Sequence, residues 1–87
     1  MTTTKQITIG EVPNGWRFFS NGAEYTARSY CTRNNRPFRR CKFGRNTLIS
    51  PCEDVVEINF MEEGQKAIDR QRAEFEVWRS RYLPEAK

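Results

Sequence analysis

Arginine dominates the part of the sequence where charged side chains could bind a ligand. No acidic residue lies between Glu24 and Glu53, whereas the same interval holds seven basic residues. Arginine binds phosphate through two parallel hydrogen bonds and stacks on planar rings. The basic residues of the interval are Arg28, Arg33, Arg36, Arg39, Arg40, Lys42 and Arg45. This segregation of charge predicts a surface that attracts a polyanion.

Aromatic residues are interleaved with these arginines. A strand surface that combines arginine with aromatic rings can follow a nucleic-acid backbone and stack on its bases. We therefore predict a small non-catalytic binding module for nucleic acid, DNA or RNA, or another polyanion. The predicted site consists of Arg28, Tyr30, Arg33, Arg36, Arg39, Arg40, Lys42 and Arg45, with Arg17 and Phe19 as an extension.

Two other interpretations of the same residues stay open at this point. The arginines could form an ordinary solvated face, or the acidic segment 53–63 could lie beside them and neutralise them. The aromatic rings could all belong to the core, since a small domain needs its aromatics inside.

Segregated charge also suits a protein–protein interface, where it orients the partners. A second hypothesis is therefore an inhibitor or adaptor that binds an acidic surface on a nucleic-acid-processing protein complex. Small phage-encoded anti-CRISPR and anti-restriction proteins have this general size and this lack of motifs, but no residue pattern ties the chain to a family. A homodimer, formed through the C-terminal helix or a sheet edge, is a further alternative.

The sequence gives no sign of catalysis, of a metal site or of a cofactor. It contains no histidine, so a Ser–His or Cys–His nucleophile is excluded. Its glycines are scattered and form no phosphate-binding loop. Cys31, Cys41 and Cys52 lack the short spacing of a zinc site, and an odd number of cysteines fits free thiols. We expect neither an enzyme nor a metalloprotein.

Length and composition set the scale of the fold. The 87 residues suffice for one small domain, 1–87. No apolar run approaches the roughly 18 residues of a membrane span, so we expect no membrane partner. The first residues contain no apolar segment of the kind found in secretion signals, so we expect a cytoplasmic location.

The pattern of apolar residues predicts a hairpin followed by further strands and a helix. Asn21-Gly22 is the strongest short hairpin signal, and a two-residue turn pairs Phe18 with Tyr25 on the core face. The same register pairs Arg17 with Thr26 on the outer face, and regular alternation places Tyr30 there too. Strands are predicted over 6–9, 16–20, 23–31, 38–43, 47–50 and 55–58, with 32–37 as a polar loop.

The last third predicts a helix over 59–83. Asn59 and Glu62 have the spacing of a capping box, and Met61, Ile68, Phe75, Trp78 and Tyr82 form an apolar stripe. We therefore predict an α+β fold, with a small hairpin-rich antiparallel sheet of three to five strands packed against one C-terminal helix. Residues 1–5 are predicted to be a flexible N-terminus, 6–58 the sheet region and 84–87 a tail.

Overall fold

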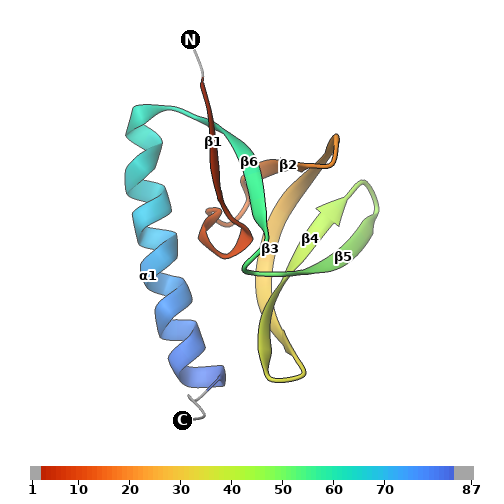
Figure 1. Ribbon diagram of the computed structural model, residues 1–87. Coiled ribbons are helices and arrows are strands. Elements are labelled where there is room, and N and C mark those ends of the chain that lie inside the picture. Colours follow the sequence, from red (N-terminus) through yellow and green to blue (C-terminus); the bar gives the residue numbers. More distant parts are fainter. Residues whose placement is uncertain (1–2, 84–87) are drawn as a thin grey trace.

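The computed structural model describes residues 3–83, which form one antiparallel sheet and a long C-terminal helix that runs beside it (Figure 1). The sheet has six strands in the order β1-β6-β2-β3-β4-β5. The α+β prediction is thus confirmed, with six strands in place of three to five. The strands are β1 (Thr3–Thr8), β2 (Arg17–Ser20), β3 (Ala23–Arg33), β4 (Arg36–Phe43), β5 (Asn46–Pro51) and β6 (Val55–Phe60). The helix α1 spans Gln65–Tyr82.

The four consecutive strands β2, β3, β4 and β5 are joined by tight turns and form a continuous meander. Asn21 and Gly22 both have positive φ, as the hairpin signal requires, and the predicted pairing of Phe18 with Tyr25 is confirmed. Residues 34–35 form a second two-residue turn, because both asparagines adopt positive φ. The predicted loop 32–37 is therefore wrong, since its flanking residues extend β3 and β4 and pair Arg33 with Arg36.

An irregularity in β3 changes which residues face the core. Ala27 pairs with Cys41 and Tyr30 pairs with Arg39, so two residues of β3 lie opposite one residue of β4. Such a β-bulge breaks the strict alternation of faces. Tyr30 therefore lies on the same face as Ala27, and the prediction that Tyr30 continues the outer face is wrong.

The core lies between the inner face of the sheet and α1. Phe18, Ile58 and Ala27 are almost completely buried, and Ile68 from the helix packs into the same cluster. A short 3-10 helix, η1 (Ile9–Glu11), follows β1 and contributes the buried Ile9 to this cluster. The face that carries Phe18 and Ile68 is called the inner face, and the opposite face the outer face.

The ends of the helix and of the sheet differ from the prediction. Asn59 lies in β6 and caps no helix, because β6 continues to Phe60 in its pairing with β1. A 3-10 turn, η2 (Glu62–Gly64), precedes α1. Residues 3–5 belong to β1 and are not a flexible end, whereas residues 1–2 and the predicted tail 84–87 lie outside the described residues. Within residues 3–83, no helix is long and apolar enough to cross a membrane.

Phe18→Ala is expected to lower the free energy of unfolding by about 3–5 kcal/mol, because it removes a buried ring and leaves a cavity. Phe43→Ala is the matched control, since Phe43 is 43% exposed whereas Phe18 is 2% exposed. Chemical denaturation followed by circular dichroism measures both values. Equal losses in the two variants would contradict the assignment of the core.

Candidate functional site

The outer face gathers most of the predicted basic residues on two neighbouring strands. Because Arg39 and Cys41 are buried on the inner face, their neighbours in β4 point outward: Arg36, Phe38, Arg40 and Lys42. Arg33 of β3 lies directly opposite Arg36, and Cys31 lies opposite Phe38. The name "basic face" is used below for Arg33, Arg36, Phe38, Arg40 and Lys42.

Within residues 3–83, no ion pair neutralises the cations of the basic face. Within residues 3–83, none of Arg33, Arg36, Arg40 and Lys42 has a carboxylate oxygen within ion-pair distance. Arg40 donates hydrogen bonds to Ser29 Oγ at 3.1 Å and to the Tyr30 carbonyl at 3.4 Å, which hold its guanidinium beside the bulge. Arg36 and Phe38 share a small recess with Glu53, but no ion pair forms there, so the positive charge remains available to an external anion.

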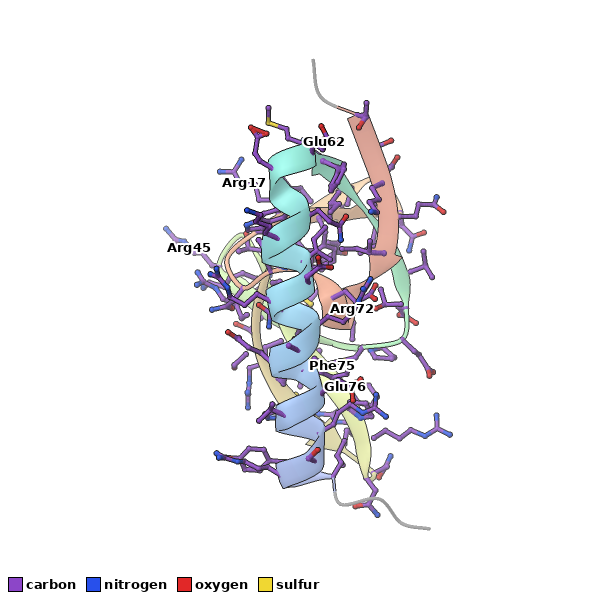
Figure 2. All side chains as sticks on the ribbon, turned by 90° about the vertical axis from the view of Figure 1, so that its left-hand side faces the viewer. Arg17, Arg45, Glu62, Arg72, Phe75 and Glu76 are labelled. Atoms are coloured by element: carbon purple, nitrogen blue, oxygen red, sulfur yellow. The ribbon has the colours of Figure 1, made fainter. Side chains whose placement is uncertain are left out.

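Two further predicted residues lie next to this face. Arg28 is exposed in the β-bulge, and Arg45 is exposed in the turn between β4 and β5, where it extends into solvent (Figure 2). Neither of them forms an ion pair among residues 3–83. Arg28 and Arg45 thus widen the positive region beyond the strands that carry the basic face.

Several other acidic residues lie away from the basic face. On the outer face, Glu24 pairs with Arg17 at 3.4 Å, and Glu57 of β6 lies opposite Phe19. Glu62 and Glu63 lie in η2, just before the helix. The predicted extension, Arg17 and Phe19, is therefore adjacent to carboxylates.

Arg39 has a structural role that sequence reasoning missed. The side chain is fully buried, so it cannot belong to an exposed surface, and its place in the predicted site is wrong. Its Nε donates to the Arg28 carbonyl at 2.8 Å, and its Nη1 donates to the Ile9 carbonyl at 2.7 Å and to the Val12 carbonyl. Burial lowers the pKa of Arg39 from its ordinary value. No carboxylate among the described residues pairs with it, so backbone carbonyls and the ring of Tyr30 stabilise the charge.

Tyr30 belongs to the same buried arrangement and not to the basic face. Its ring lies over the Arg39 guanidinium, 4.5 Å from ring centroid to Cζ, and stacks on Phe75 of α1. Its hydroxyl donates to the Gly10 carbonyl at 2.7 Å and accepts from Gln71 Nε2 at 2.8 Å. Burial raises the pKa of Tyr30. Tyr30 therefore connects η1, β4 and α1, and only the bulge in β3 brings it there.

The cysteines do not form a shared site. Cys41 and Cys52 are buried, and burial raises the pKa of both thiols, that of Cys52 to about 12. Cys31 is half-buried on the outer face, opposite Phe38. Among residues 3–83, no three of the Cys, Asp and Glu side chains gather closely enough to hold a metal ion.

Comparison with known proteins identifies no relative: no family model, no curated protein and no solved structure matches the chain. Its function is therefore inferred from its own residues and geometry.

Arg39→Met is expected to lower the free energy of unfolding by at least about 2 kcal/mol, since each buried carbonyl left without a partner costs about 1–3 kcal/mol. Arg39→Lys is expected to lose most of the same stability, because an ammonium cannot reproduce the forked contacts. Arg36→Met is the control, and as an exposed substitution it should change stability by less than about 0.5 kcal/mol. Similar urea midpoints for Arg39→Met and Arg36→Met would show that the buried guanidinium is dispensable.

Thiol reactivity is expected to separate the three cysteines. A disulfide reagent at about pH 8 should modify Cys31 in the native protein, whereas Cys41 and Cys52 should react only on unfolding, because they are buried and their raised pKa keeps them protonated. The rapid phase should disappear in Cys31→Ser. Three thiols that react at one rate would contradict this arrangement.

Proposed function

We propose that this protein binds nucleic acid through its basic face and carries out no catalysis. The proposal depends above all on one observation: the guanidiniums of Arg33, Arg36 and Arg40 share the outer face and lack carboxylate partners among residues 3–83. Phosphate contacts supply most of the affinity of sequence-independent nucleic-acid binding, and arginine is well suited to make them.

The shape of the site supports a long polyanion in preference to a small anionic ligand. The cations are spread along β3 and β4 and into the turn at Arg45, and they do not converge on one point. A small phosphate ligand needs several groups that converge on a concave pocket. A chain of phosphates needs cations along a line, with aromatic rings between them, and Phe38 lies half-buried among the arginines.

A protein with an acidic surface is the second candidate. It is favoured by Ile49 of β5, which pairs with Arg40 on the outer face and is 38% exposed. Arginine beside an exposed apolar side chain is typical of residues that dominate protein interfaces. Such a partner could be a nucleic-acid-processing complex that the protein inhibits or recruits.

The test is fluorescence anisotropy with labelled single-stranded and double-stranded oligonucleotides over a salt series. If about five cations contact phosphates, the slope of log K against log salt should be about −3.5 to −4.5. The double substitution Arg33→Gln, Arg36→Gln should weaken binding and make the slope shallower by about two, because two phosphate contacts are lost. Lys66→Gln is the control, since Lys66 is exposed on α1 and its substitution removes a positive charge outside the basic face.

Failure to bind either oligonucleotide at low salt would overturn the nucleic-acid proposal. A stoichiometric protein partner whose binding is lost in the Arg33→Gln, Arg36→Gln variant would then support the second candidate. Equal weakening by Lys66→Gln would show that overall charge, and not the basic face, carries the binding.

A further inference from the structure

The C-terminal half of α1 presents a ridge of aromatic rings beside the sheet. Trp78 packs on Tyr30 in a tilted arrangement, with ring centroids 5.2 Å apart, and Tyr82 packs on Trp78 in the same way at 5.7 Å. Exposure increases along this series, from the half-buried Trp78 to Tyr82, which is 60% exposed. The name "aromatic ridge" is used below for Trp78 and Tyr82. The core explains the position of Trp78, but it does not explain why Tyr82 stays in solvent.

The ridge stands between two open recesses. The first has a volume of about 490 Å³ and is lined by Arg40 and Thr32 of the sheet together with both rings. No carboxylate lines it. The second recess, also about 490 Å³, lies on the other side of the rings and includes Arg70, Arg81 and one carboxylate, Glu74. Cations therefore flank the ridge on both sides, and Arg40 belongs to the first recess and to the basic face at once.

The first recess is accessible because β2 is shorter than its neighbour β3. In the described residues, β2 pairs only with residues 23–26 of β3, so residues 28–33 have a strand on one side only. The helix approaches this unpaired side through Phe75, which stacks on Tyr30, and through Trp78, which packs on Tyr30 at a tilt. The free edge, the exposed ring of Tyr82 and the Arg40 guanidinium thus surround one space.

We propose that this space receives an unstacked base, so that the ligand of the basic face is a single strand. A base would stack on Tyr82 and Trp78 while Arg40 contacts the adjacent phosphate, and the strand would continue over Arg36 and Arg33. In a duplex the bases are paired and stacked inside, and their faces cannot reach the ridge. The inference rests on the proposed function and adds the class of nucleic acid. Stacking accepts any base, so the binding should depend little on sequence.

The experiment uses oligothymidine of about 12 nucleotides, within the range of site sizes for single-strand binding surfaces. Oligothymidine should quench the intrinsic tryptophan fluorescence, and the quenching should be lost in Trp78→Phe, which leaves Trp16 as the remaining tryptophan. Tyr82→Ala should weaken binding at least about fivefold, the lower end of the contribution of one base–aromatic stack. Tyr82→Phe should bind like the parent protein, because it keeps the ring.

The salt slope separates stacking from phosphate contact. Tyr82→Ala should keep the slope of the parent protein, and the affinity for a duplex of equal length should not change. Met61→Ala is the matched control, because Met61 is 51% exposed and lies at the opposite end of the helix.

Two results would overturn the inference in different ways. The first result is salt-dependent binding of oligothymidine without quenching and with full affinity in Tyr82→Ala. It would exclude a base from the aromatic ridge and would make the ridge a contact for a protein partner, while the proposed function would stand. Absence of any binding at low salt would remove both the inference and the proposed function.

Discussion

The buried guanidinium of Arg39 is the interaction on which the two faces of the sheet depend. It connects three parts of the chain. Arg39 itself lies in β4, and it binds the carbonyls of Ile9 and Val12 in the segment after β1 and the carbonyl of Arg28 in the bulge of β3. A buried cation without a carboxylate is costly unless its donors are occupied, and three backbone carbonyls occupy most of them. Only Nη2 lacks a hydrogen-bond partner among the described residues. Arg39 thus attaches β4 to neighbouring segments on the inner face, while the opposite side of the same strand carries Arg40 and Lys42.

This arrangement also explains why adjacent arginines have different roles. Arg39 and Arg40 are neighbours in sequence, but they point to opposite faces of β4, as successive residues of a strand must. Arg39 is surrounded by carbonyls, whereas Arg40 is exposed to solvent and donates a hydrogen bond to Ser29. A single basic run therefore supplies both a core contact and a ligand contact, and net charge along the sequence cannot distinguish them.

Local signals in the sequence were enough for most of the secondary structure. Asn21-Gly22 determines its own turn, and alternation determines which face of β2 is apolar, so the Phe18–Tyr25 pairing could be predicted. The pair Asn34-Asn35 is a turn signal of the same kind, and it could have placed Arg33 opposite Arg36. All six strand segments could be located from the sequence, but local patterns do not show which segments pair, so one sheet holds six strands in place of the predicted three to five. The capping pattern at Asn59 was misleading, because pairing with β1 stabilises the strand conformation there.

The position of Tyr30 and the burial of Arg39 could not be predicted in this way. Both depend on the bulge in β3, and no residue near 28–29 marks a bulge in the sequence. The exposed ring of Tyr82 beside Arg40 depends on how α1 lies against the sheet, which is a tertiary property. Local patterns thus identify the basic residues, whereas long-range packing decides which of them reach solvent.

The order of the elements along the chain has a consequence for biosynthesis. Strands β2 to β5 are consecutive and pair with their nearest neighbours, so this part of the sheet can form from local contacts while translation continues. The pairing of β1 with β6, and the packing of Ile68, require residues that are translated later. A nascent chain therefore displays its arginines before α1 has covered the apolar side of the same sheet. During that interval the ribosome, itself rich in nucleic acid, is the nearest polyanion.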